Sequence, residues 1–377
     1  MDIVSNSIEL PFEILRAIFL LSLTLAYPTE AASFHKYVLE PSYKKEPLSY
    51  THVCRWWRAV ALAVPELWMA VSGTRDWVGY TSPGVLRIWM EHAHNSLTMR
   101  DIGRAIHPSQ ALHLHLGNPP STMEKYTPRT VKVLKHFWNQ ITLCRSLSLT
   151  LDLYLIPHFY DLIKDKNNLP AMPLLEDVEL VFISRPAGFS AQGNAIISWL
   201  KSLPALRRLR WLYTRRIIKS SPRVFLGNLP FEKLDTLSLT CAMPFKVALC
   251  YIGRCTSATT VHINNLETFN PSAFELHQFD QPILELPNLR SLTLEGGEDP
   301  SLALSYLTLP GLKHLKVIKL MQRGPMDGRE FEAFFRRSGC SLKKLHLEDG
   351  DIPSDSMVSF LATPEVQKIK ELILVGL

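Results

Sequence analysis

The sequence predicts an α/β solenoid, in which parallel strands alternate with returning helices, preceded by a small N-terminal helical module. Three observations predict this fold: a short apolar motif recurs nine times from residue 144 onward, helical periodicity lies between several copies, and prolines precede several copies at a fixed place. The chain has 377 residues and is 46% hydrophobic and 20% charged. It is therefore expected to bury a sizeable core and is too apolar to be mostly disordered.

Composition and charge exclude several functional classes. The 41 basic and 35 acidic residues leave a formal charge of +6, a mild excess that does not predict nucleic-acid binding. The first residues lack the basic start of a secretory signal, and the apolar stretch 14–27 is too short to span a bilayer and contains Arg16. A cytoplasmic or nuclear protein without a membrane partner is expected. The six scattered cysteines are expected to be reduced core residues.

Two helical segments are expected near the N-terminus. The first begins at Pro11, which suits a first helical turn, and its apolar residues form a broad stripe of Ile14, Leu15, Ile18, Phe19 and Leu21. The second covers residues 48–64 and ends at Pro65, with one apolar face made by Val53, Trp57, Val60, Ala61 and Val64. The tryptophans Trp56, Trp57 and Trp68 are consistent with a small helical core or with a partner surface.

The ordered motifs L-P-F-E-I-L, V-C-R-W-W-R-A-V-A and P-E-L-W resemble the F-box of the large fungal F-box families, from Ile8 to about Ser72. The resemblance implies a module over residues 1–72 that docks on the Skp adaptor of a cullin–RING ubiquitin ligase. The insertion at about residues 27–47 is longer than the usual F-box loop. The implied adaptor-binding residues, some of which are expected to be internal core, are Leu10, Pro11, Ile14, Leu15, Ile18, Val53, Cys54, Trp57, Leu67 and Trp68.

From residue 144 to 377 the motif L-x-x-L-x-L recurs, with a mean spacing of about 28 residues. The fourth positions of its nine copies are Leu147, Val178, Leu209, Leu237, Val261, Leu292, Leu315, Leu345 and Leu372. The pattern resembles an irregular leucine-rich-repeat stack of the kind that follows F-boxes, although the usual asparagine or cysteine after the last leucine is absent. Helices are expected at 194–203, 329–337 and 354–362.

Prolines stand two residues before four copies of the motif, at Pro173, Pro204, Pro287 and Pro310. There they are expected to end the returning helix and lead into the strand. The segment 73–143 is a linking and capping region, with a helix expected at 85–93 and strands at 95–102 and 111–117.

Candidate target-binding residues lie beside the fourth position of each motif, because side chains alternate along a strand. They are Arg208, Arg210, His262, His314, Lys316, Lys344 and His346. Eight basic and no acidic residues lie between Lys201 and Arg223, either an anion site or a solvated basic face. The pairs His92/His94 and His113/His115 lack further ligands at useful spacing, so neither a metal nor another cofactor is expected.

No catalytic motif is present, so a non-enzymatic role is expected. The resemblance implies a substrate-recognition subunit of a Skp–cullin–F-box ubiquitin ligase, which binds the Skp adaptor and, through its repeats, a protein target. The alternative is a leucine-rich-repeat scaffold whose N-terminal helices only cap the solenoid. That alternative predicts that the apolar stripe from Leu10 to Ile18 is buried within the chain. A hydrolase built on strand–helix units would need convergent titratable residues, which the spacing does not predict.

Overall fold

The computed structural model divides the chain into two compact units. Unit 1 holds Met1–Glu179 and Leu203–Ala205, and unit 2 holds Leu180–Ser202 and Leu206–Leu377. The structure describes residues 10–26, 47–72, 75–76, 79–80, 83–98, 112–117, 128–165, 169–183, 189–213, 226–267, 283–297, 300–320, 326–349 and 355–376.

Unit 1 begins with helices and continues into strands. Its helices are α1 (Phe12–Ala26), α2 (Arg55–Ala63), α3 (Pro83–Thr98), α4 (Pro128–Asn139) and α5 (Leu155–Ile163), with the 3-10 turns η1 (Leu48–His52), η2 (Pro65–Leu67) and η4 (Ile141–Leu143). Its strands are β1 (Ala70–Ser72), β2 (Arg75–Asp76), β3 (Gly79–Tyr80), β4 (Leu112–Leu116) and β5 (Cys144–Leu151). Strand β6 (Asp177–Phe182) spans the division between the units.

Unit 2 alternates strands with helices or short turns. Its helices are α6 (Phe189–Ser202), α7 (Phe245–Arg254), α8 (Gly328–Ser338), α9 (Asp355–Leu361) and α10 (Pro364–Gln367), with the 3-10 turns η5 (Leu226–Asn228), η6 (Phe231–Lys233) and η8 (Pro300–Tyr306). Its strands are β7 (Arg208–Tyr213), β8 (Thr236–Pro244), β9 (Thr260–Glu267), β10 (Leu284–Glu285), β11 (Ser291–Gly296), β12 (Leu307–Thr308), β13 (His314–Lys319), β14 (Lys344–Glu348) and β15 (Glu371–Val375).

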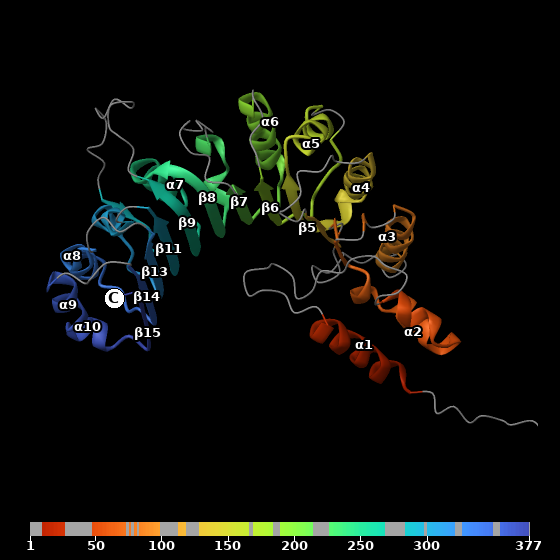
Figure 1. Ribbon diagram of the computed structural model, residues 1–377, viewed down its shortest axis with the longest axis horizontal. Helices are drawn as coiled ribbons and strands as arrows, with labels where there is room; N and C mark the ends of the chain where they lie inside the picture. Colours follow the sequence, from red (N-terminus) through yellow and green to blue (C-terminus); the bar gives the residue numbers. More distant parts are fainter. Residues whose placement is uncertain are drawn as a thin grey trace, which may run out of the picture. The chain divides into compact units, whose positions relative to one another are not determined.

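An 11-stranded sheet has the order β1-β4-β5-β6-β7-β8-β9-β11-β13-β14-β15 (Figure 1). The pairs β1–β4 and β4–β5, and every neighbouring pair from β7 to β15, are parallel. All nine predicted motifs lie on strands of this sheet, and the helices expected at 194–203, 329–337 and 354–362 are α6, α8 and α9. The expected α/β solenoid-like arrangement of parallel strands and helices is confirmed.

The fourth position of eight of the nine motifs is buried in the core, as the alternation predicted. Leu372 on β15 is the exception, since 42% of its surface is exposed. Strand β15 is last in the sheet order and, among the described residues, pairs with β14 alone. The apolar side chains of β15 therefore remain in contact with solvent.

The repeat prolines occupy turns immediately before the strands. Leu289 N donates to Leu286 O at 3.3 Å, and Leu312 N donates to Leu309 O at 3.2 Å. Each bond closes a four-residue turn. The first turn has Pro287 at its second position, where the fixed φ of proline suits the turn and no backbone donor is needed. Pro310 occupies the same position in the second turn. The prolines therefore set the chain reversal itself, in addition to leading into the strand.

The turn at Gly311 has no space for a side chain. A Cβ atom there would lie 2.3 Å from Pro287 O, a backbone atom of the preceding repeat. We expect Gly311→Ala to lower the free energy of unfolding by about 1–3 kcal/mol, because the two turns must separate. Urea unfolding measures the change. Gly227→Ala is the control, because a Cβ at Gly227 meets no atom within 4 Å; equal losses in the two variants would contradict this packing.

The linking region contains one error of prediction. The helix expected at 85–93 and the strand expected at 111–117 are present as α3 and β4. The strand expected at 95–102 is wrong for residues 95–98, which continue helix α3, and residues 99–102 lie outside the described part of the chain. No breaker separates the two segments, so the helix already formed by the apolar face of α3 extends through them.

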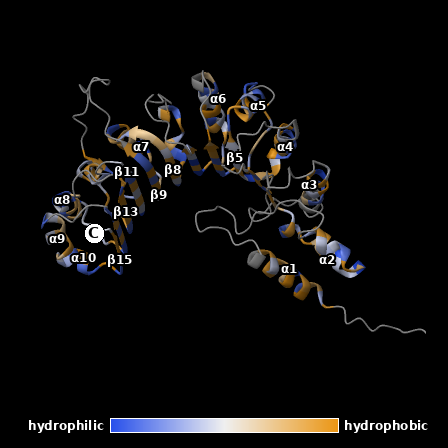
Figure 2. Ribbon diagram, viewed as in Figure 1, coloured by the Kyte–Doolittle hydropathy of each residue, from blue (hydrophilic) through white to orange (hydrophobic). Residues whose placement is uncertain are grey.

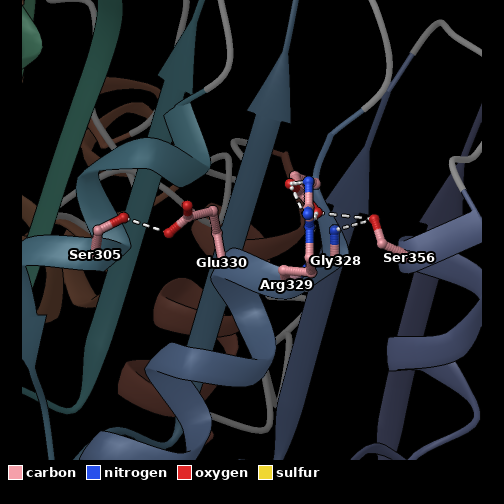
Figure 3. A network of polar contacts seen from close by, with 6 residues as sticks. Ser305, Gly328, Arg329, Glu330 and Ser356 are labelled. Carbon is pink, nitrogen blue, oxygen red and sulfur yellow. Dashed lines mark hydrogen bonds and ion pairs between the residues drawn. The ribbon is translucent and has the colours of Figure 1, made fainter.

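Polar contacts fix the N-terminus of α8 to its neighbours in unit 2 (Figure 3). The Asp327 carboxylate caps the helix by accepting from Arg329 N at 3.0 Å, and it also accepts from Ser356 Oγ at 2.8 Å. Hydrogen bonds from the Arg329 side chain lower the pKa of Asp327 to about 2. Glu330, in the first turn, accepts a hydrogen bond from Ser305 Oγ. Helix α8 is thereby held between η8 and α9.

The cysteines differ from expectation at one position. Cys144, Cys241 and Cys255 are buried thiols, and burial raises the pKa of each to about 12. Cys250 and Cys340 are half-buried. The prediction of a core residue is wrong for Cys54, which is exposed, because its sulfur accepts from Trp57 N at 3.4 Å and caps helix α2.

Candidate functional site

Helix α1 presents two apolar faces, of which only one packs inside the chain. Leu15, Phe19 and Leu23 are buried. The Phe19 ring stacks on Tyr50 of η1 with 4.3 Å between centroids and meets the edge of Trp57 of α2 at 5.1 Å. These three apolar residues on successive turns hold α1 against the rest of the helical module.

The opposite face of α1 is apolar and exposed. We call Leu10, which lies just before the helix, and Ile14, Ile18 and Leu21 the α1 stripe; these side chains expose 39%, 49%, 43% and 60% of their surface. Figure 2 shows hydrophobic colour along most of α1. Two polar contacts fix the helix without covering the stripe: Trp56 Nε1 donates to Leu10 O at 2.8 Å, and Arg16 pairs with Glu66 at 2.6 Å. This exposed apolar face is therefore the candidate site in unit 1.

The ten predicted adaptor-binding residues divide between surface and core. Leu10, Pro11, Ile14, Ile18, Val53 and Cys54 are exposed, and Trp57 is half-buried. Leu15, Leu67 and Trp68 are completely buried within the chain, so they build the module and do not present a surface. Trp68 donates from Nε1 to Ala61 O at 2.9 Å and packs edge-on against Trp89 of α3 at 5.6 Å.

The second predicted helix is interrupted. Residues 48–52 form η1, Cys54 is extended, and α2 starts only at Arg55, so Val53 leaves the predicted apolar face and is 58% exposed. Helix α2 ends at Ala63, and Pro65 starts η2. The predicted insertion at residues 27–47 lies outside the described residues except for Pro47. Leu21 was omitted from the predicted adaptor-binding set, although its position three residues after Ile18 places it on the same face.

In unit 2, the residues beside the buried leucines align in register across the strands. The first polar row is Arg208, Thr236, Thr260, Ser291, His314, Lys344 and Glu371. The second polar row is Arg210, Ser238, His262, Thr293, Lys316, His346 and Ile373. All seven predicted target-binding residues lie in these two rows. The sequence motif therefore identified which residues share a face.

Basic groups dominate the second polar row. Burial lowers the pKa of His262, and the charges of Arg210 and Lys316 lower it further. Burial also lowers the pKa of His346, with additional lowering by Lys316. Both histidines are consequently favoured in the neutral form near pH 7.

Carboxylates lie at the margins of the two rows. Lys344 Nζ pairs with Glu371 at 2.6 Å, and His346 Nε2 lies 3.7 Å from Glu348 Oε2. On β11, Glu295 lies two residues after Thr293, the member of the second row on that strand. The segment of the second row from Arg210 to Lys316 contains no acidic residue. Ser238 on β8 and Thr293 on β11 lie between the basic residues of this segment, and both are buried.

The predicted basic run between residues 201 and 223 is only partly described. Lys201 is exposed, and Arg207 pairs with Asp235 at 3.4 Å. Arg208 and Arg210 belong to the two rows, whereas Arg215, Arg216, Lys219 and Arg223 lie outside the described residues. The run therefore contributes to the strand face through two of its members, and the choice between an anion site and a solvated face depends on the rows.

In the two predicted histidine pairs, His92 and His115 contact neighbouring side chains. His92 packs against Trp68 at 4.9 Å between ring centroids, and His94 has no described side chain. His113 and His115 share a face of β4, and His115 Nδ1 lies 2.8 Å from Ser148 Oγ. Among the described residues, no three His, Cys, Asp or Glu side chains form a group that could hold a metal ion. Within the same residues, no helix combines the length and apolarity needed to cross a membrane.

The described residues form an α/β solenoid-like arrangement of strands and helices, with an exposed apolar helix face in unit 1 and polar strand rows in unit 2. No protein-family model and no curated protein matches the chain.

Proposed function

We propose that this chain is a non-catalytic substrate-recognition subunit of a Skp–cullin–F-box ubiquitin ligase. In this proposal, residues up to about 72 bind a Skp-type adaptor, and the repeats hold a protein target. The observation that carries the proposal is the α1 stripe, an exposed apolar face on a helix whose opposite face is already buried. The order of the F-box-like motifs adds support, because the stripe contains Leu10 and Ile14 of the first of those motifs.

The mechanism is tethering. Binding both an adaptor and a target to one chain raises the effective concentration of target lysines near the ubiquitin-conjugating enzyme of the ligase. The chain supplies no reacting group in this scheme. Its contribution is the relative placement of two partners, and the polar rows of unit 2 are the surface offered to the target.

A scaffold whose N-terminal helices only cap the repeats is the second candidate. It is favoured by the direct connection between the module and the sheet: Trp68 packs on Trp89, and β1 follows η2 and pairs with β4. A pure cap should bury its apolar surface within the chain, however, and Ile14 and Ile18 remain exposed. The exposure of the stripe therefore favours the adaptor-binding proposal.

The test replaces Ile14 and Ile18 together by aspartate in the full chain. We expect adaptor affinity to fall by at least about 100-fold, because each buried isoleucine contributes about 1.5–3 kcal/mol and the new charges would be desolvated. Capture of a purified Skp-type adaptor and of the adaptor–cullin complex measures the loss. The full chain is used because deleting residues 1–72 would remove β1 from β4 and Trp68 from Trp89.

Val358→Asp is the matched control, since Val358 is an exposed apolar residue on α9 of unit 2. We expect the control to bind the adaptor normally, and both proteins to unfold within about 0.5 kcal/mol of the unsubstituted chain. Adaptor binding by Ile14→Asp/Ile18→Asp at the level of the control would refute the proposal. The capping role would be favoured if the unsubstituted chain bound no adaptor and Ile14→Asp/Ile18→Asp were less stable than the unsubstituted chain.

A further inference from the structure

The open edge of strand β15 in unit 2 is a third surface, separate from the α1 stripe and from the polar rows. Strand β15 lies beside β14 (Figure 1) and, among the described residues, pairs with no other strand. Glu371 N donates to Lys343 O at 3.0 Å, which fixes the residues of β15 that bond to β14. Alternate residues of a parallel strand bond to the same neighbour, so Leu372 and Leu374 point their backbone N–H and C=O groups to the open edge.

The side chains of β15 add an apolar surface at this edge. Leu372, Leu374 and Val375 expose 42%, 40% and 43% of their surface. Natural edge strands are commonly protected from pairing by lysine, by proline or by a bulge. Residues 371–375 contain neither lysine nor proline, and their register with β14 is continuous. Their one carboxylate, on Glu371, is bound to Lys344 at 2.6 Å. Strand β15 therefore presents an unprotected edge.

The other edge strand of the sheet does not offer a matching surface. Strand β1 has only three residues, and its Ala70 and Val71 are buried. Head-to-tail stacking of copies would need an open β1 edge as long as that of β15. Contact between copies through β15 is therefore favoured with the same strand of the second copy, and this requires the two β15 strands to run antiparallel about a two-fold axis.

Strand β15 is complementary to itself in one antiparallel register. With Leu372 opposite the second copy's Leu374, and the reverse, the strands exchange four N–H···O bonds and use every edge-facing backbone group of residues 371–375. This register gathers the four leucines on one face and places Ile373 opposite its own counterpart on the other. Glu371 lies opposite Val375, so no like charges meet.

We infer that β15 binds β15 of a second copy of this chain, and that the two chains thereby form an antiparallel two-fold dimer. The inference goes beyond the proposed function, because unit 2 alone carries it and no adaptor is involved. Two five-residue strands make an interface well below the standard size of about 1,600 Å². The dimer is therefore weak and forms at dissociation constants of about 10–100 µM.

Sedimentation equilibrium of the full chain without adaptor, from about 5 to 500 µM, is the first test. We expect the mass to rise from 42.9 kDa toward twice that value and to stop there. Leu372→Lys/Leu374→Lys should weaken association by at least about tenfold, because lysines of the two copies would face each other. Leu302→Lys/Leu320→Lys is the control, since these similarly exposed leucines of unit 2 lie outside β15, and it should stay within about twofold.

Cysteine cross-linking tests the register independently of the lysine variant. A non-hydrogen-bonded antiparallel pair has about 4.5 Å between Cα atoms, so Ile373→Cys should link two chains under oxidised glutathione. Leu372→Cys is the comparison, because Leu372 lies diagonally from its counterpart, beyond the roughly 7 Å that a disulfide spans. We expect Ile373→Cys to link at least about tenfold faster on a non-reducing gel. The unsubstituted chain, with its exposed Cys54, gives the background.

Three results would overturn the inference. They are a mass that stays at 42.9 kDa up to about 500 µM, equal weakening in the lysine variant and its control, and equal cross-linking at positions 372 and 373. Ile14→Asp/Ile18→Asp is expected to dimerise normally, and loss of association in that variant would assign the contact to the α1 stripe instead. A monomeric chain whose β15 edge binds the peptide Lys-Thr-Val-Thr-Val-Thr-Gly would replace the second copy by a foreign strand. Each of these outcomes leaves the adaptor test of the ligase proposal unchanged.

Discussion

Replacing Asp349 by alanine is expected to lower the free energy of unfolding of unit 2 by about 3–5 kcal/mol. Asp349 follows β14 and accepts from Lys319 Nζ at 3.2 Å and from Met326 N at 2.8 Å. Both side chains of the ion pair are only 1% exposed. Alanine would remove a charged acceptor from a buried ammonium and from a buried amide, and no water could replace it without opening the structure. Urea unfolding monitored by circular dichroism measures the loss.

Two further variants separate the charge from the packing. Asp349→Leu with Lys319→Met removes both charges, so we expect it to recover much of the loss, although the hydrogen bond from Met326 N to Asp349 is still lost. Glu371→Ala breaks the Lys344–Glu371 pair, an exposed contact on the neighbouring strand β15, and should cost less than about 1 kcal/mol. If Asp349→Ala costs no more than Glu371→Ala, the pair is not buried as the structure places it.

The repeat strands could be predicted because their signal is periodic and local. Leu209, Leu237 and Leu292 each lie at the fourth position of a short motif, and alternation alone places them in the core and their neighbours on the opposite face. That same alternation identified Arg210, His262 and Lys316 as residues of one face. Their alignment in one row depends on strand register, which the structure supplies.

The sequence could not divide the N-terminal module into surface and core. Leu15 and Ile18 have similar side chains and lie three residues apart, yet Leu15 is buried and Ile18 is 43% exposed. The difference depends on where Tyr50 and Trp57 pack against α1, contacts that are distant in the sequence. Lys319 and Asp349 illustrate the same limit, because a buried ion pair across 30 residues leaves no local pattern.

Trp68 tests that division directly, because it was one of the ten adaptor-binding residues that the F-box resemblance implied, and the structure places it in the core. Trp68→Ala is expected to lower the free energy of unfolding of unit 1 by about 3–5 kcal/mol with no partner present. The loss combines a large cavity beside Trp89 with the hydrogen bond from Trp68 Nε1 to Ala61 O, which holds η2 against α2. Chemical unfolding followed by tryptophan fluorescence measures it on the isolated chain.

Ile18→Ala is the matched comparison, because Ile18 is also an apolar residue of the module but lies in the α1 stripe. Its removal creates no cavity, so its unfolding should change by no more than about 0.5 kcal/mol, while its adaptor affinity falls. Trp68→Ala should instead lose adaptor binding only to the extent that the module unfolds, and low temperature or a stabilising osmolyte should restore it. A stable Trp68→Ala protein that cannot bind adaptor would return Trp68 to the binding surface and contradict the packing of η2 against α3.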